Sequence, residues 1–276
     1  MTQLEKQNKL SAAVLESVNE VQKLGYTVLY AANYGSHNYN LDVNNDEYQS
    51  DIDTKVIILP TLEELVHNTK PVSTTIEIST GQCDIKDIRA FVPTLLKANI
   101  QFLETLGARM YWINPLYEED FQWFIDNLES LISESKNELL KSIKGMCYEK
   151  QKALCHPYPT IKWKIDKWGY DGKQLHHIMR LKDFVDNYFY NNRSFIYAIW
   201  YDEEDPRKQL MMQAKLNKLP LRQALDWAEI YCDLVTREVD RLIDGTFQKA
   251  EYKEQYQRKA DEIIIKNIKK KILEGR

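Results

Sequence analysis

The chain has 276 residues, which is enough for one large domain or two modest ones. Hydrophobic residues make up 43% of it and charged residues 28%, a globular balance that argues against a disordered protein. The formal net charge of −4 argues against a general nucleic-acid coat protein, although it is compatible with a local basic cleft.

The first part of the chain alternates between helix and strand patterns. Apolar positions at a helical period predict a helix over residues 4–24, which Gly25 ends. Thr61 and Glu64 have the spacing of a capping box, so a helix should begin there. The remaining elements expected here are strands at about 26–32, 52–59 and 74–80, a short helical turn at Gly35-Ser36, and one long helix over 88–106.

Beyond Asn114-Pro115 the pattern is helical to the end of the sequence. The expected helices run over about 121–133, 134–154, 174–190, 207–216, 221–244 and 248–273. The fold class is therefore α+β, with a small sheet and flanking helices followed by an all-helical domain. We place the catalytic domain at residues 1–115 and the helical domain at 116–276.

Asp51 and Asp53 open the second expected strand. Residues alternate faces along a strand, so their carboxylates should point the same way and Ile52 the other way. Two adjacent carboxylates repel each other unless a cation lies between them. Rigid, hard oxygen ligands with room for substrate phosphates suit Mg²⁺. Two acids at a solvated strand end are the alternative interpretation.

Gly35 and Ser36 follow the first expected strand and open a short turn of helix. Such a turn presents backbone N–H groups and a hydroxyl to an anion. Taken alone, an ordinary strand-to-helix turn would be the better interpretation. The downstream Asp-x-Asp pair favours phosphate binding instead.

The order strand, Gly-Ser, gap, Asp-x-Asp resembles the DNA polymerase beta-type nucleotidyltransferase superfamily. A second stretch, residues 167–181, reads Lys-Trp-Gly-Tyr-Asp-Gly-Lys-Gln-Leu-His-His-Ile-Met-Arg-Leu. It is similar to a helix of the predicted nucleotidyltransferases associated with RNA ligases in bacteria and phages. Residues 87–106 resemble that family's Leu-Arg-x-Phe, Leu-Lys-x-Asn-Pro and Leu-Glu-x-Leu helix, with Ile100 in place of the proline.

The resemblance implies a polymerase-beta-like sheet and a nucleotidyltransferase that depends on Mg²⁺ or Mn²⁺. Such an enzyme moves a nucleoside monophosphate from an NTP, such as ATP, to a hydroxyl or phosphate acceptor and releases pyrophosphate. The acceptor could be an RNA end, a protein or a small molecule. The alternative is a non-catalytic module that binds nucleotide or RNA in the same cleft.

The resemblance also implies a third carboxylate on a neighbouring strand, as a metal ligand and activator of the acceptor hydroxyl. Asp84 is our choice, because it follows the third expected strand and precedes the Asp87-Ile88-Arg89 helix. Glu77, within that strand, is the first rival. Asp87 is the second, although a residue at a helix start is more often a cap.

Lys173, His177 and Arg180 follow one another at i, i+4 and i+7, so they share a helix face. We expect this face to bind the nucleotide and to close the cleft from the helical domain. A solvated basic face is the alternative, and His177 could instead be a core histidine. His176 points about 100° away and falls outside the set.

The sequence predicts a cytoplasmic protein with no membrane partner. No apolar run approaches the roughly 20 residues that span a bilayer. The polar N-terminus is not a signal peptide. The four cysteines are too widely spaced for a zinc motif or a disulfide framework. Given the resemblance, the compartment would be a bacterial cell, or a host cytoplasm for a phage-encoded chain.

Overall fold

The computed structural model describes residues 3–44, 49–245 and 249–274, which form two compact units. So far as they are described, residues 1–38, 42–135 and 247–276 make up the first unit. The second takes in residues 39–41 and 136–246. The functional division expected at residue 115 stays a prediction. Residue 248, where the last helix was expected to begin, lies outside the described ranges.

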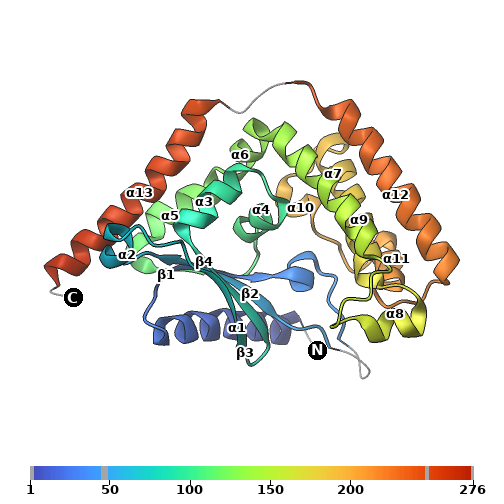
Figure 1. Cartoon of the computed structure of the whole chain (residues 1–276), viewed down its shortest axis with the longest axis horizontal. Coiled ribbons are helices and arrows are strands. Elements are labelled where there is room, and N and C mark those ends of the chain that lie inside the picture. The colour runs from blue at the N-terminus through green and yellow to red at the C-terminus, as the bar shows by residue number, and fades with distance from the viewer. Residues whose placement is uncertain (1–2, 45–48, 246–248, 275–276) are drawn as a thin grey trace. The chain divides into compact units, whose positions relative to one another are not determined.

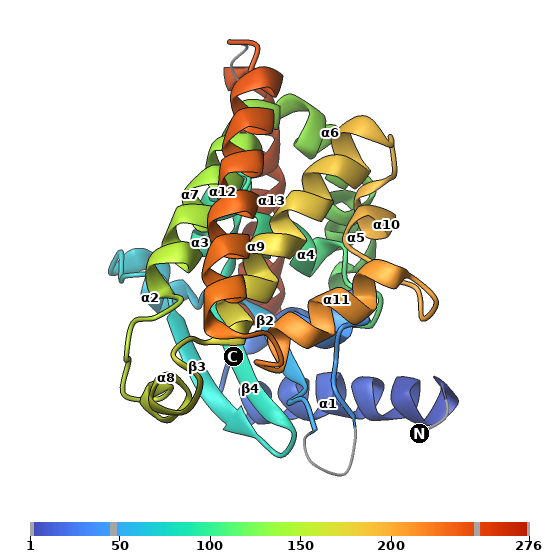
Figure 2. The ribbon, with the colours of Figure 1, turned by 90° about the vertical axis from the view of Figure 1, so that its right-hand side faces the viewer.

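The first unit is built on a five-stranded mixed sheet with the order β3-β4-β2-β1-β5 (Figure 1). The strands are β1 (Thr27–Tyr34), β2 (Asp53–Leu59), β3 (Ser73–Ile78), β4 (Gly81–Asp87) and β5 (Tyr111–Ile113). Strands β2 and β4 pair in parallel and the other neighbours pair antiparallel. The β3–β4 hairpin is seen in Figure 2. With its flanking helices, this sheet confirms the α+β class.

Helices cover both faces of this sheet. The helices of the unit are α1 (Gln3–Lys23), α2 (Leu62–Val66), α3 (Ile88–Leu96), α4 (Ile100–Leu106), α5 (Glu118–Asp126), α6 (Leu128–Glu134) and α13 (Ala250–Leu273). On one face, Val14 and Val18 of α1 bury against Val56 of β2. On the other face the Tyr30 ring stacks on Phe121 of α5, with centroids 4.5 Å apart. The two faces of the sheet therefore pack against different helices.

The prediction of a single helix over 88–106 is wrong, because the structure has two helices there, α3 and α4. Lys97 ends α3, and Ala98 has a positive φ of 49°. The side chain of Asn99 then accepts a hydrogen bond from the Gln101 amide at 3.0 Å and caps α4. Pro93 lies inside α3 and does not break it. The helix expected over 121–133 is likewise two, α5 and α6, which meet at Asn127.

All the regular secondary structure among the described residues of the second unit is helical. Its helices are α7 (Lys136–Ala153), α8 (Lys162–Trp168), α9 (Gly172–Val185), α10 (Phe195–Ala198), α11 (Pro206–Lys215) and α12 (Leu221–Leu242), and a π-helical turn (Asp186–Tyr190) follows α9. Sequence periodicity missed the short helices α8 and α10. Free Cys147 and Cys232 meet between α7 and α12, with sulfurs 3.0 Å apart. None of the helices in the described part of the chain is long and apolar enough to cross a membrane.

Gly81 of the β3–β4 hairpin lies close to the start of β2. A Cβ there would lie 2.8 Å from the Ile52 carbonyl oxygen and 2.9 Å from Asp53 Oδ1. Gly81→Ala should therefore lower the free energy of unfolding by about 1–3 kcal/mol in urea denaturation, because both contacts are overpacked. Gly145→Ala in α7 is the matched control, since a Cβ there meets nothing within 4 Å.

Gly145→Ala should raise the free energy of unfolding by about 0.5–1 kcal/mol, because alanine loses less backbone freedom on folding. Equal effects of the two substitutions would contradict the tight approach at Gly81.

Candidate active site

Asp51 and Asp53 differ in their structural setting. Strand β2 begins at Asp53, which is half-buried, whereas Asp51 precedes the strand and is exposed. Ile52 between them is buried, and its amide donates to the Thr80 carbonyl at 2.8 Å. The β3–β4 hairpin thus hydrogen-bonds to the chain just before β2, and Asp51 lies outside the strand and is exposed.

The Asp53 carboxylate lies between two glycine-containing turns. Its Oδ1 accepts a hydrogen bond from the Gln82 amide at 3.1 Å. Its Oδ2 is 3.7 Å from the position that a Cβ on Gly35 would take. Gly35 has a φ of +79°, a left-handed conformation that glycine adopts at no steric cost. Gly35 opens a 3₁₀ turn (Gly35–Tyr39) in which Ser36 is half-buried. The structure therefore brings the Gly-Ser turn and Asp53 together.

Asp84 lies on β4, the strand parallel to β2, where its register partner is Lys55. The Lys55 ammonium contacts Asp84 Oδ2 at 2.8 Å, and the Lys86 ammonium contacts Oδ1 at 2.9 Å. Both oxygens of the predicted third carboxylate are thus ion-paired. Sequence reasoning missed Lys55, although its spacing of two from Asp53 places it on the same strand face.

The two rivals for the third carboxylate have other roles in this structure. Glu77 is exposed on β3 and accepts from the Gln82 side-chain amide at 2.9 Å. Asp87 is completely buried, caps α3 through the Arg89 amide at 2.8 Å, and pairs with the Arg89 guanidinium at 2.6 Å. Asp87 therefore serves as a helix cap.

The described residues contain no group of three or more His, Cys, Asp or Glu side chains placed to hold one metal ion. Asp51 and Asp53 offer hard oxygen donors at the start of β2, which suit a divalent cation. Asp84 does not fit as a third ligand in this conformation, because both of its oxygens are taken by lysines. Metal binding by these three residues stays a prediction.

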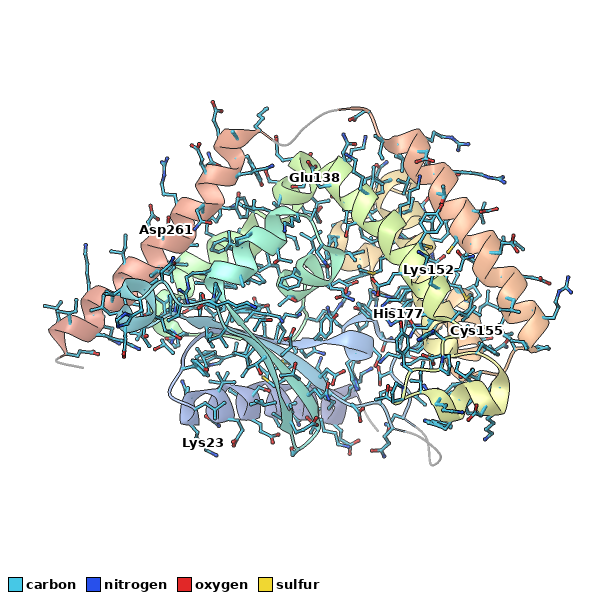
Figure 3. The ribbon with its side chains drawn as sticks, in the orientation of Figure 1. Lys23, Glu138, Lys152, Cys155, His177 and Asp261 are labelled. Carbon is cyan, nitrogen blue, oxygen red and sulfur yellow. The ribbon has the colours of Figure 1, made fainter. Side chains whose placement is uncertain are left out.

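In the second unit, α9 carries the predicted basic face. Lys173 is exposed, His177 is half-buried and Arg180 is 4% exposed (Figure 3 labels His177). The Arg180 guanidinium stacks 3.6 Å from the centroid of the Tyr39 ring, a cation–π contact. Asp171 caps the helix by accepting from the Lys173 amide at 3.2 Å. Of these three residues, only Lys173 is thus exposed.

His176, which the sequence interpretation set aside, is buried beside these cations. It is 2% exposed, and neither ring nitrogen has a hydrogen-bond partner among the described residues. Burial, then the charges of Lys215, Arg180 and Lys173, lowers the pKa of His176 well below its ordinary value. Burial also lowers the pKa of His177. Leu175, Ile178 and Met179 around His176 were the sequence signal for a buried position.

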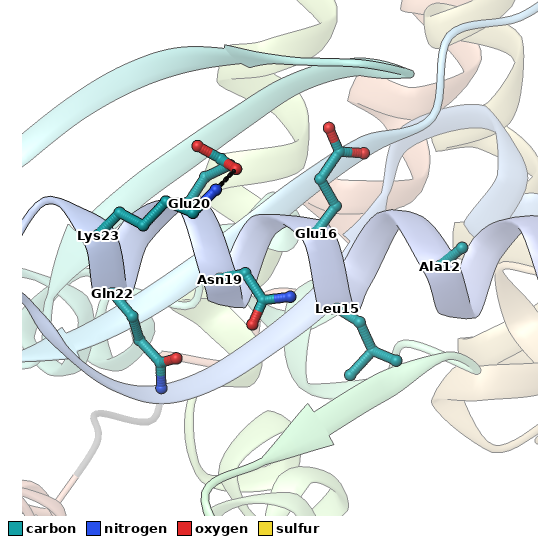
Figure 4. A pocket seen from close by; sticks show the side chains of 7 residues that line it. All are labelled: Ala12, Leu15, Glu16, Asn19, Glu20, Gln22 and Lys23. Atoms are coloured by element: carbon teal, nitrogen blue, oxygen red, sulfur yellow. Dashed lines mark hydrogen bonds and ion pairs between the residues drawn. The ribbon is translucent and has the colours of Figure 1, made fainter.

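Two surface hollows lie apart from all the predicted site residues. One is lined by seven residues of α1, among them Leu15, Glu16 and Lys23 (Figure 4). The other is lined by Ile265, Lys269 and their neighbours at the end of α13. Each is formed by a single helix and brings no catalytic side chains together.

No protein-family model matches the chain, and no curated protein matches it significantly. Among solved structures, a nucleotidyltransferase-like protein from Exiguobacterium sibiricum 255-15 is similar, with 13% sequence identity and a TM-score of 0.32. That similarity covers 83% of this chain and 75% of the other.

His176 should make the protein sensitive to acid. The folded chain keeps this imidazole neutral, whereas the unfolded chain binds a proton near pH 6.5, so the unfolded state gains protons as pH falls. Stability from the neutral His176 is therefore complete above about pH 6.5 and is lost below it. Below about pH 6.5, the free energy of unfolding of wild type should fall with pH more steeply than that of His176→Leu, by up to about 1.4 kcal/mol per pH unit. The measurement is urea unfolding of both proteins from pH 8 to pH 5.

The measurement at pH 8 is the internal control, because the imidazole is then neutral in both states. A difference between wild type and His176→Leu that stays constant from pH 8 to pH 5 would contradict the assignment.

Proposed function

We propose that the protein is a nucleotidyltransferase that depends on Mg²⁺ or Mn²⁺. It would transfer a nucleoside monophosphate from an NTP, such as ATP, to a hydroxyl or phosphate acceptor and release pyrophosphate. One observation carries the proposal: the left-handed Gly35 turn lies against the carboxylate of Asp53, 3.7 Å from the Gly35 Cβ position to Oδ2. A phosphate-binding type of turn therefore adjoins a metal-binding type of side chain.

In this proposal Asp51 and Asp53 hold the cation, and Gly35 and Ser36 bind the nucleotide phosphates. A divalent cation would neutralise charge on the phosphates during transfer. The Gln82 amide fixes Asp53 Oδ1, which orients the carboxylate before substrate arrives. Orientation in advance lowers the cost of reaching the reactive geometry.

Asp84 is the proposed third carboxylate, beside the acceptor. Lys173, His177 and Arg180 are proposed to bind the nucleotide. Arginine suits paired contacts to phosphate and lysine a single contact. The proposed acceptor is an RNA end, a protein or a small molecule. The residues and loops around the site would select among them, because the fold by itself does not determine the substrate.

A non-catalytic module that binds nucleotide or RNA is the second candidate. The observation that favours it is the pairing of both Asp84 oxygens with lysines, at 2.8 and 2.9 Å. In such a module Asp84 would have no role in transfer, and nucleotide would bind without turnover.

Nucleotidyl transfer is tested with each α-labelled NTP, Mg²⁺ and either total RNA or lysate protein as acceptor. Asp53→Asn should lower the rate of label transfer by about 100- to 1,000-fold, because a neutral amide is a poor ligand for the cation. Glu77→Gln is the matched control on the neighbouring hairpin and should retain wild-type transfer. If wild type transfers no more label than Asp53→Asn with any acceptor, the enzyme proposal fails. Nucleotide binding without transfer would then favour the binding module.

Lys173 provides a separate test in the second unit. Lys173→Ala should raise the KM for the NTP by about 10-fold with a smaller change in kcat, because it removes one charged contact to phosphate. Lys152→Ala is the control, since Lys152 is also an exposed lysine of this unit (Figure 3). Equal KM values for the two variants would remove Lys173 from the nucleotide site.

A further inference from the structure

Lys55 is buried on the face of the sheet that carries Asp53 and Asp84, which we call the acidic face. It is 3% exposed, although lysine is among the residues least often buried. Two residues separate it from Asp53 along β2, so the two side chains leave the strand on the same face. Its register partner across the parallel ladder is Asp84.

Three groups of the first unit hold the Lys55 ammonium. Asp84 Oδ2 lies 2.8 Å from it. The Tyr34 and Phe102 rings lie at 4.7 and 4.5 Å from it, measured to their centroids. Both distances fall within the range of cation–π attraction. The ammonium is thus held by an ion pair and two aromatic faces, and the Lys55 side chain is 4% exposed, whereas that of Asp84 is 27% exposed.

This arrangement conflicts with a metal ion on Asp84. A divalent cation there would have to displace the Lys55 ammonium from Oδ2, or share the carboxylate with it. Sharing would place two positive charges at close range beside a lysine side chain that is 4% exposed, which is unfavourable. The second oxygen is taken as well, because Lys86 contacts Oδ1 at 2.9 Å and also donates to the Ser73 hydroxyl.

We infer that Lys55 is a built-in cation of the candidate active site, which holds Asp84 in place of a second metal ion. The site would then take one divalent cation, at Asp51 and Asp53. Lys55 is a positioning residue, because it acts on the reaction through Asp84. This inference rests on the proposed function. It specifies that the site binds one metal ion and that the Lys55 ammonium takes the place of a second.

The number of bound ions tests the inference without measuring turnover. The full chain is dialysed against Mn²⁺ and a non-hydrolysable ATP analogue, and bound Mn²⁺ and bound analogue are counted together. We expect one Mn²⁺ per bound analogue in wild type and in Asp84→Asn. Two Mn²⁺ in wild type, falling to one in Asp84→Asn, would overturn the inference and leave the proposed function standing.

Substitutions at Lys55 provide the second readout. Lys55→Met should release Asp84 and allow a second Mn²⁺ per analogue, whereas Lys55→Arg should retain one, because it keeps the positive charge. Lys86→Met is the matched control and should also retain one, since Lys55 still occupies Oδ2. A count of one in Lys55→Met would contradict the inference.

The inference can still be tested if the Lys55→Met variant fails to fold. If Lys55→Met is unfolded by circular dichroism, wild type and Asp84→Asn decide by their counts alone. Failure of the proposed nucleotide site looks different, because wild type would then bind neither Mn²⁺ nor the analogue, and the inference would fall with it. Failure of transfer alone is detected by the label-transfer assay, since a binding module would still bind the analogue.

Discussion

The parallel pairing of β2 with β4 determines the chemistry of the acidic face. A parallel ladder sets each residue of one strand beside a fixed residue of the next, and here Lys55 is beside Asp84. The same pairing carries the Gln82 amide to Asp53 Oδ1. A shift of one residue would send Lys55 to the apolar face packed on α1, where Thr54 and Val56 now lie. The hydrophobic core under α1 thus fixes the polar contacts on the opposite face.

Burial of the Lys55 ammonium explains why it stays paired with Asp84. The Lys55 side chain is 4% exposed, so removal of Asp84 would leave a buried positive charge without compensation, which is unfavourable. Lys86 is in a different position, since its side chain is 19% exposed and solvent can replace Asp84 as its partner. The two lysines therefore contact the same carboxylate but differ in their access to solvent. Loss of Asp84 would leave Lys55, and not Lys86, with little access to water.

The second unit buries titratable groups whose pKa values shift in opposite directions. Burial raises the pKa of Asp183 to about 6, although the Tyr201 hydroxyl donates to it at 3.1 Å. Burial and nearby cations lower the pKa of His176. Protonation of Asp183 in the folded state favours folding below about pH 6, whereas the neutral His176 opposes it there. Lowering the pH therefore has opposite effects on the free energy of unfolding through these two groups: it is raised through Asp183 and lowered through His176.

The sequence alone determined the α+β class, most helices and the candidate residues, because hydrophobic period and capping residues act locally. The capping box at Thr61 and Glu64 is present as expected. The break at Ala98, by contrast, depends on a positive φ and an asparagine cap that helical periodicity cannot reveal.

Tertiary structure alone decided which side chains meet. Gly35 lies against Asp53 because β1 and β2 pair antiparallel, with Tyr34 opposite Asp53. Asp84 meets Lys55 rather than a carboxylate because the strands that carry them are neighbours in one register. Sequence spacing reports which face of one strand a residue occupies. It does not report which strand lies beside it, since that depends on how the whole sheet packs between its helices.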